Sequence, residues 1–466
     1  MSSTKSESDT SDMSTKRPFR IRTITTFVTL HPDDFKEDND DVFTGLATKI
    51  NKCNDILRKL ETSLTNIGYE VQTVRIATNP FGEWLTISGD YDDNGPLTQK
   101  KLKVDESGAI DKTTTRVKKR LTKLEELLDA KDINFCSLGP SVIPNDTLSI
   151  CPIIVESSGK FSCSANINAG DIESARAAAT CMQIISKLGD DNDAKNAGQT
   201  TDTNHIKGGL GNFRFCAASC IKSVPFFPGA RAPSDANHSF SFAIGLENGG
   251  FAHDLLEEAA NIGNIKNVFH KKMRDELLPI QEVCTSFVND NEKTNVQYLG
   301  IDTSLNPSLD EGGSVAEAIE SLEEVRDSFG GTGTLAAAAA ITTSLQSIPG
   351  ITTTGYSGLM LPVLEDQRLA DLGRNSCAPE GQSKDGLTVQ KLLCISSVCG
   401  VGIDTVPIPG NVSEDDLSSL ILDVAALASR WNKPLSCRVF PVPGGKAGEE
   451  TTFDSPYMCN SCIFDL

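Results

Sequence analysis

Strand-like and helix-like segments alternate along this chain, and that alternation restricts its possible folds more than any other feature. Residues 21–28 alternate in the manner of a half-buried strand. Residues 44–67 carry apolar side chains at helical spacing, and Gly68 follows them as a helix terminator. Residues 69–77 then alternate again. A strand, a long helical crossover and a second strand are typical of an α/β fold.

The alternation continues to the end of the chain, which predicts an α/β fold throughout. Helices are expected over residues 112–131, 174–188, 252–289 with an interruption near Pro279, 314–328, from 334 onward, and 414–429. Further strands are expected over residues 135–138, 213–219, 239–246, 297–301, 395–401 and 436–442. Residues 149–155 are a β-branched run, and the polar stretch 190–205 is interpreted as a surface insertion.

Composition along the chain predicts three parts. Residues 1–18 are rich in Ser, Thr and charged side chains and are expected to be a disordered tail. Residues 19–450 contain the alternating pattern without an obvious linker, so they are expected to form a single large α/β domain. Residues 451–466 are interpreted as a Cys-containing C-terminal tail.

The net charge excludes two classes of partner. The 466 residues include 43 Lys and Arg against 63 Asp and Glu, a formal charge of −20. Nucleic acids and anionic membrane surfaces repel such a protein. No stretch approaches the roughly 20 apolar residues of a membrane span. We therefore expect no nucleic-acid partner and no membrane partner.

The fourteen cysteines indicate a reducing compartment. They are scattered and usually adjoin apolar or small residues, which is typical of reduced, buried cysteines in cytosolic proteins. The N-terminal residues lack the apolar core of a secretory signal. A cytoplasmic location is the expectation.

Residues 394–410 hold the densest group of chemically special residues. Cys399 stands beside small residues, five positions before Asp404. The thiol is a candidate nucleophile, redox group or metal ligand. The alternative is a buried strand in which Cys and Gly allow close packing, and no adjacent His or Lys supplies the positive charge that activates a thiol.

A glycine-rich junction precedes the alanine-rich helix. Gly331, Thr332, Gly333 and Thr334 stand where backbone N–H groups and the helix dipole favour an anion. The junction lacks the Lys of a P-loop, so nucleotide binding is not implied. The alternative is a plain helix cap made of small residues.

Two predicted strands end in further candidate ligands. Arg75 lies on an otherwise apolar strand, with Thr78 at its end. A buried Arg is costly unless it is paired, so it has either an internal carboxylate or a bound anion as partner. Asp302 and Ser304 leave another strand and offer a carboxylate and a hydroxyl, or else an Asx-type backbone cap.

Metal-ligand spacing is absent from the sequence. The five histidines form no HExxH or comparable pattern. The CxxC pair Cys459 and Cys462 has no second pair to complete a zinc site. No metal ligands are therefore assigned, and an oxygen-ligand set of Asp302, Asp404 and Glu247 has no spacing signal behind it.

In their shared order, these segments resemble a known family, domain of unknown function family 711. The resemblance covers the chain from Ile21 to about Glu449. It rests on residues 74–80 (VRIATNP), 162–167 (SCSANI), 225–229 (PFFPG), 300–305 (GIDTSL) with 313–316 (GSVA), 331–334 (GTGT), 399–404 (CGVGID) with Pro409, and 438–441 (RVFP) with Gly444 and Lys446.

The resemblance implies a fold similar to pyruvate formate-lyase-like barrels, in which ten strands form an α/β barrel around an inserted hairpin. In the glycyl-radical enzymes of that superfamily the hairpin carries a cysteine that becomes a thiyl radical, and Cys399 occupies a comparable segment. The radical-bearing glycine is not matched, because Pro441 stands in the nearest candidate motif. Glycyl-radical catalysis is therefore not expected.

The leading functional hypothesis is a non-radical enzyme acting on a small anionic metabolite: a carboxylate, an amino-acid derivative or a phosphate. Arg75 would hold the anion with the amides of residues 331–334, and Cys399, Asp302 and Asp404 would provide nucleophilic or acid–base chemistry. The first alternative is a non-catalytic metabolite-binding or regulatory protein on an enzyme-derived barrel, and the second is a structural protein without a pocket. The cofactor is unknown, and homo-oligomerisation stays open.

Overall fold

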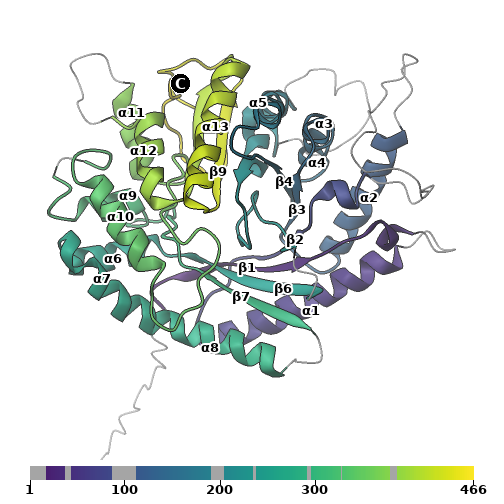
Figure 1. The fold of residues 1–466 in the computed structure, drawn as a ribbon, viewed down its shortest axis with the longest axis horizontal. Coiled ribbons are helices and arrows are strands. Elements are labelled where there is room, and N and C mark those ends of the chain that lie inside the picture. Colours follow the sequence, from purple (N-terminus) through teal and green to yellow (C-terminus); the bar gives the residue numbers. More distant parts are fainter. Residues whose placement is uncertain are drawn as a thin grey trace, which may run out of the picture.

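The computed structural model describes residues 17–36, 43–86, 112–189, 204–234, 238–290, 295–326, 328–377 and 386–466. Within them, nine strands form one mixed sheet surrounded by helices, which confirms the α/β class (Figure 1). The predicted N-terminal tail lies outside the described residues except for Arg17 and Pro18, and the predicted surface insertion lies outside them except for Asn204 and His205.

The sheet contains two sets of strands that run in opposite directions. Its order is β7-β6-β1-β2-β3-β4-β5-β9-β8, with β1 to β5 mutually parallel. Strand β6 is antiparallel to β1 and parallel to β7, and β9 is antiparallel to β5 and parallel to β8. The strands are β1 (Arg20–Val28), β2 (Val74–Thr78), β3 (Phe135–Ser141), β4 (Phe161–Asn166), β5 (Phe215–Ser219), β6 (Phe240–Glu247), β7 (Val296–Asp302), β8 (Gly402–Pro409) and β9 (Leu435–Val442).

An irregular segment lies between the two outer strands of the sheet. Thr353 and Leu359 form parallel bridges with Ile301 and Leu305, at and beyond the end of β7. Pro362 bridges to Asp404 on β8. Residues 353–362 therefore approach β7 at one end and β8 at the other.

Helices cover the outward face of the sheet because their apolar faces match the apolar side of each strand. In α1 the buried residues recur every three or four positions and pack against β1 and β2. The helices are α1 (Thr44–Asn66), α2 (Lys112–Asp129), α3 (Pro144–Ser149), α4 (Cys151–Ser157), α5 (Ile172–Ser186), α6 (Gly249–Ala259), α7 (Ile265–Val268), α8 (Arg274–Asp290), α9 (Val315–Glu320), α10 (Thr334–Leu345), α11 (Gln367–Ser376), α12 (Val389–Cys399) and α13 (Glu414–Trp431).

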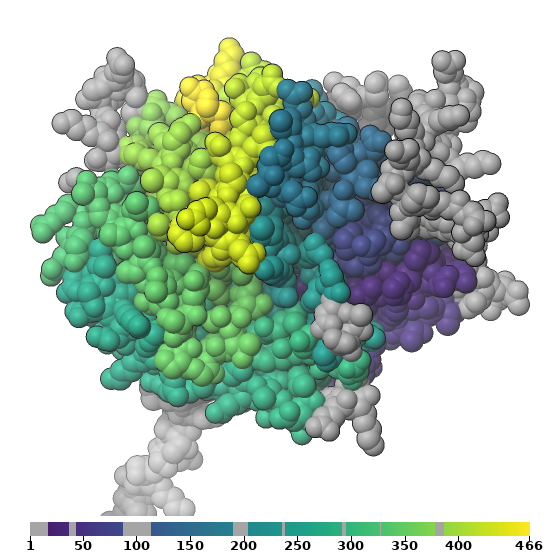
Figure 2. All heavy atoms as spheres, in the orientation of Figure 1, coloured from purple at the N-terminus to yellow at the C-terminus, as the bar shows by residue number. Residues whose placement is uncertain are grey.

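Distant parts of the sequence meet in this arrangement. Figure 2 shows the yellow C-terminal end of the chain packed against its blue-teal middle, in accord with the pairing of β5 with β9 and of α5 with α13. No helix in the described ranges is long and apolar enough to cross a bilayer.

The strand predicted over residues 395–401 is wrong. This stretch ends α12, where Thr388 caps the helix by accepting from the Lys391 N–H, and Gly400 closes it in the left-handed region at φ 70°. The strand β8 begins only at Gly402. Cys399 is therefore the last residue of a helix rather than part of a hairpin. Burial at helical spacing outweighs the β-branched composition of the stretch.

Two other local predictions also fail, the interruption near Pro279 and the length of the helix over residues 314–328. The interruption expected near Pro279 is absent, because Pro279 lies inside α8, whose residues Leu277, Ile280 and Cys284 are buried on one face. The chain instead breaks at Ala260, at φ 59°. The β-branched run 149–155 is helical, with Pro152 in the first turn of α4 where it costs no hydrogen bond. The helix predicted over 314–328 is shorter, ending at Glu320.

The cysteine prediction holds for most of the chain. Nine of the free cysteines are buried, but Cys377 and Cys462 form a disulfide, which corrects the expectation of thiols alone. The partner of Cys462 is thus Cys377, which directly follows α11, and not Cys459. The C-terminal residues also pack on the domain: the Cys459 N–H donates to the Leu364 carbonyl at 2.8 Å, and the Phe464 N–H donates to that of Pro407 at 2.9 Å.

Candidate functional site

Side-chain alternation sends one set of residues outward to the helices and a second set into a shared interior. On β2, Val74 and Ile76 join the main apolar core beneath the helices, whereas Arg75 between them lines a cavity. On β9, Cys437 and Val439 likewise join that core, whereas Arg438 lines the cavity. Strands distant in sequence therefore contribute charged side chains to one space.

The cavity has a volume of about 60 Å³. At about 10–15 Å³ for each water, it holds about four to six waters or a small metabolite. One part of its wall is apolar and the other is charged or polar. The lining residues are Arg22, Arg75, Phe226, Phe227, Pro228, Asn306, Pro307, Tyr356, Met360, Pro362, Glu365, Val401, Asp404, Ser436 and Arg438.

Arg75 is a buried cation without a carboxylate partner. Only 4% of the residue is exposed, and its Nε donates to Thr73 Oγ1 at 2.9 Å. The guanidinium lies 4.7 Å from the ring centre of Phe227 and 5.2 Å from that of Phe135. Among the described residues it forms no ion pair, and its terminal nitrogens have no hydrogen-bond acceptor. Burial, together with the nearby charge of Arg22, lowers the pKa of Arg75.

Arg438 is buried to a similar degree but has two carboxylate partners. Its Nε lies 2.6 Å from Asp404 Oδ1, and its Nη2 lies 2.8 Å from Glu365 Oε1. Burial alone would lower the pKa of Arg438, and the charges of Asp404 and Glu365 reverse this and raise it. Burial raises the pKa of Glu365, an effect that Arg438 opposes and Asp404 reinforces.

Arg22 is also neutralised. Its Nη1 lies 2.6 Å from Glu247 Oε2, and Gln72 Nε2 donates to the other oxygen of Glu247 at 2.6 Å. Arg20 adds a second ion pair to the same carboxylate. Of the three arginines that line the cavity, two are therefore paired and Arg75 is not.

Tyr356 supplies a neutral hydroxyl to the cavity wall. Its Oη donates to Ser436 Oγ at 3.2 Å. Burial, reinforced by Cys216, raises the pKa of Tyr356, so its hydroxyl stays protonated. Tyr356 and Ser436 are therefore hydrogen-bonding groups beside the three guanidiniums.

Comparison with known proteins places the chain among its relatives. A family model described as Uncharacterised ACR (DUF711) matches residues 12–454. The chain belongs to this family.

The relatives are named UPF0210 proteins. One from Oleidesulfovibrio alaskensis is 25% identical over 95% of this chain and 90% of its own length. One from Methanopyrus kandleri is 32% identical over 44% of each chain, and one from Methanocaldococcus jannaschii is 29% identical over 50% of this chain and 51% of its own. In the latter two matches, this chain spans about half the length of the relative.

Of the site residues predicted from sequence, the DUF711 chain brings Arg75 and Asp404 together. Both line the cavity. Arg75 interacts electrostatically with Glu365, and Asp404 forms an ion pair with Arg438. The other predicted residues are not among the lining side chains: Thr78, Asp302, Ser304, Gly331, Thr332, Gly333, Thr334 and Cys399.

Asp302 organises the loop that carries Tyr356. It is fully buried and accepts hydrogen bonds from the Tyr356 N–H at 2.8 Å, the Ser357 N–H at 3.0 Å and the Ser304 hydroxyl at 2.6 Å. Burial raises the pKa of Asp302, and these hydrogen bonds oppose the rise. The geometry is that of the backbone-capping alternative, and a catalytic role for Asp302 or Ser304 stays a prediction.

Cys399 lies in the core of the DUF711 chain. It is fully buried at the end of α12, and burial raises the pKa of its thiol despite the nearby charge of Lys433. A protonated thiol is a poor nucleophile. Its catalytic role stays a prediction that the local environment does not favour.

The glycine-rich junction and Thr78 make local contacts. Gly333 begins α10 at φ 94°, and the Gly330 N–H donates to Thr334 Oγ1 at 3.0 Å. The Gly331 N–H donates to the Ser328 carbonyl at 2.9 Å. The hydroxyl of Thr78 donates to the Asn79 carbonyl at 3.0 Å. These contacts are those of a helix cap and a strand end, and anion binding at the junction stays a prediction.

Sequence reasoning did not assign Arg22, Tyr356, Glu365 or Arg438 to the site. Arg438 carries the same signal that identified Arg75, a cation on a mostly apolar strand, whereas the strand of Arg22 also contains Arg20 and three threonines. Glu365 and Tyr356 lie on irregular segments, where no periodicity marks the inward face.

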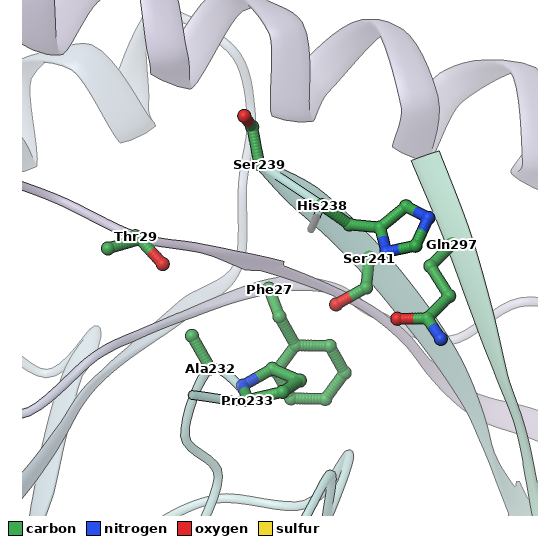
Figure 3. Close-up of a pocket in the computed structure, with 8 residues that line it drawn as sticks. All are labelled: Phe27, Thr29, Ala232, Pro233, His238, Ser239, Ser241 and Gln297. Carbon is green, nitrogen blue, oxygen red and sulfur yellow. The ribbon is translucent and has the colours of Figure 1, made fainter. Parts of the chain in front are cut away.

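A second hollow is too small for a metabolite. Figure 3 shows His238, which precedes β6, beside Gln297 on β7, near Phe27 and Pro233. The volume is about 10 Å³, room for about one water. In the described part of the chain, His, Cys, Asp and Glu side chains form no group of three that could hold a metal ion.

Proposed function

We propose that this protein binds a small anionic metabolite in the cavity and that Arg75 is its principal ligand. The observation that carries the proposal is a guanidinium with 4% exposure, no ion pair among the described residues and two terminal nitrogens without acceptors. An isolated buried charge costs several kcal/mol. A ligand carboxylate or phosphate recovers that cost through charge-assisted, bidentate hydrogen bonds.

The cavity supports a non-radical enzyme as the first form of this function. Glu365 combines a raised pKa with a place on the cavity wall, and both properties suit a general acid or base. Tyr356 adds a hydroxyl donor. The substrate is a carboxylate, amino-acid derivative or phosphate, and the reaction involves proton transfer beside the bound anion.

A non-catalytic metabolite-binding protein is the second candidate. Both Glu365 and Asp404 are held by Arg438, an arrangement that also serves to keep one guanidinium in place. Incubating the protein with its ligand separates the two candidates, because only an enzyme changes the proton NMR spectrum of the ligand over time.

The fold that we propose around this cavity is a closed ten-stranded barrel similar to the pyruvate formate-lyase-like barrels. Two oppositely directed sets of strands support it, and so do the bridges that residues 353–362 make towards β7 and β8. The cavity then lies inside the barrel. Pro441 at the nearest radical-glycine motif and the helical position of Cys399 argue against the radical chemistry of that superfamily.

A thermal-shift screen tests the proposal. The panel contains carboxylates, amino acids, phosphorylated metabolites and inorganic anions. A ligand at about 100 times its Kd adds about 2.7 kcal/mol of stability. The Arg75→Met variant should lose this stabilisation. Arg176→Met is the matched control, because Arg176 is an exposed arginine paired with Asp415 on α13. Equal stabilisation of all three proteins would contradict the proposal.

A further inference from the structure

The charges around the cavity are formally balanced but unevenly distributed. Three guanidiniums, those of Arg22, Arg75 and Arg438, line it. Three carboxylates face them. Glu247 is on Arg22 and is shared with Arg20, whose own charge is balanced by Asp310, whereas Glu365 and Asp404 are both on Arg438. Without a ligand, the surplus carboxylate at Arg438 compensates for the unpaired charge of Arg75 only from a distance.

An anion on Arg75 removes that compensation. The ligand adds a fourth negative charge opposite three positive ones, in a cavity walled partly by Phe226, Met360 and Pro362. Arg75 and Glu365 interact electrostatically, so a ligand that neutralises Arg75 also removes a positive charge that favours the ionised form of Glu365. A net negative charge in such a site is relieved when one carboxylate takes up a proton.

We propose that binding of an anion at Arg75 places a proton on Glu365, which makes Glu365 the proton-carrying group of the occupied cavity. The inference rests on the proposed function and assigns the proton within that same site.

The geometry selects Glu365 over the other carboxylates. Glu247 accepts from Arg22 and Gln72 and is paired a second time by Arg20, so it is held by more donors than Glu365. Asp404 makes the shorter contact with Arg438, at 2.6 Å. Glu365 has a single contact of 2.8 Å to the same guanidinium and is flanked by the negative charge of Asp404.

The charged groups that face Glu365 come from four strands. Arg438 on β9 and Arg22 on β1 stabilise its ionised form, and Arg75 on β2 adds to them until a ligand is bound. Asp404 on β8 opposes them. Because binding cancels one of the three positive contributions, the pKa of Glu365 is higher in the complex than in the free protein.

The sign of the pH dependence follows. Between the two pKa values of Glu365, binding takes up a proton, so affinity rises as the pH falls. Within that interval the affinity decreases by about tenfold for each unit by which the pH rises, and above the higher value it no longer changes. A ligand that binds without a proton has constant affinity over the same range.

Isothermal titration calorimetry with acetate tests the proposal on the intact protein. Acetate is a monoanion small enough for the cavity. Titrations at one pH in imidazole and in Tris, cationic buffers that differ in heat of ionisation and do not compete for an anion site, give the number of protons taken up. Across a pH series we expect an interval in which uptake approaches one proton and the affinity falls with the slope above. Glu365→Gln should bind acetate with no proton uptake and with constant affinity.

The outcomes separate the two proposals. Acetate binding that depends on Arg75 but takes up no proton overturns the role of Glu365 and leaves the anion site standing. Proton uptake that persists in Glu365→Gln overturns it as well. Absence of acetate binding at every pH overturns this inference. If no other anion of the screening panel stabilises the protein in an Arg75-dependent way, the proposed function fails with it. The proton count of the unmodified protein is decisive even if Glu365→Gln does not fold.

Discussion

Arg75 and Arg438 line one cavity and differ chiefly in their carboxylate partners. Each lies on a strand, each is less than a tenth exposed, and each guanidinium lies over an aromatic ring, at 4.7 Å from Phe227 for Arg75 and 5.1 Å from Phe213 for Arg438. Arg438 holds two carboxylates, whereas Arg75 holds none among the described residues. Removing a paired buried cation leaves its carboxylates unpaired, whereas removing an unpaired one does not, and this difference underlies our proposal that Arg75 binds the ligand.

Removing the paired arginine, Arg438, should have the largest effect on stability. Arg438→Met leaves Asp404 and Glu365 without their cation, so we expect the free energy of unfolding to fall by about 3–5 kcal/mol. Urea denaturation measures this change. A loss no larger than that of the surface variant Arg176→Met would remove the distinction between the two arginines.

Removing the unpaired arginine, Arg75, should affect anion binding rather than folding. Arg75→Met removes a buried charge that has no carboxylate partner, so the ligand-free protein should be as stable as the unmodified one or more stable by about 1 kcal/mol. The stabilisation of about 2.7 kcal/mol by saturating anion should disappear. Thermal melts with and without the anion check both statements, and strong destabilisation of the ligand-free variant would reveal a hidden structural role.

A substitution at Cys399 tests whether the anion site lies in the cavity beside Arg75. Cys399→Ser puts a hydroxyl into the core, which we expect to cost about 1–2 kcal/mol of stability. Anion binding should be unchanged, because Cys399 does not line the cavity. Calorimetry measures the binding, and a matching turnover assay tests the catalytic role predicted from sequence. Loss of binding in a folded Cys399→Ser protein would move the site away from Arg75.

Substitution of Glu365 should give the smallest change in stability, and this change should depend on pH. Its folded-state pKa is raised, mainly by burial, so its ionisation weakens the native state as the pH rises above the unfolded value of about 4.3. Glu365→Gln removes that penalty. The stability of the variant relative to the unmodified protein should therefore increase with pH, which urea titrations across a pH series measure. The opposite slope would mean that Arg438 outweighs burial at this residue.

Much of the fold can be predicted from local patterns. The α1 and α13 helices and the strands around residues 24, 75, 244 and 439 follow directly from periodicity, because each buries one face. The stretch ending at Cys399 could not be assigned in this way. Its β-branched residues favour a strand in isolation, and only packing beneath α10 and α13 selects the helix.

Only part of the candidate site could be predicted from local sequence patterns. Arg75 and Asp404 could be identified because a charge on an apolar strand is conspicuous. Asp404 forms an ion pair with Arg438, whereas Arg75 has no carboxylate partner among the described residues. This difference depends on sheet order, because β2 and β9 are separated by β3, β4 and β5. Their side chains converge only through the three-dimensional arrangement of the strands.

The sequence by itself therefore determined the α/β class, most of the elements and the family, because hydrophobic periodicity and ordered motifs are local properties. Tertiary structure alone decided which charges are neutralised. An ion pair depends on distances of about 3 Å between atoms whose residues here lie 34, 73 and 225 positions apart in the sequence. Such distances exist only after the sheet has assembled, and they separate the paired arginines from Arg75, which we propose as the ligand-binding one.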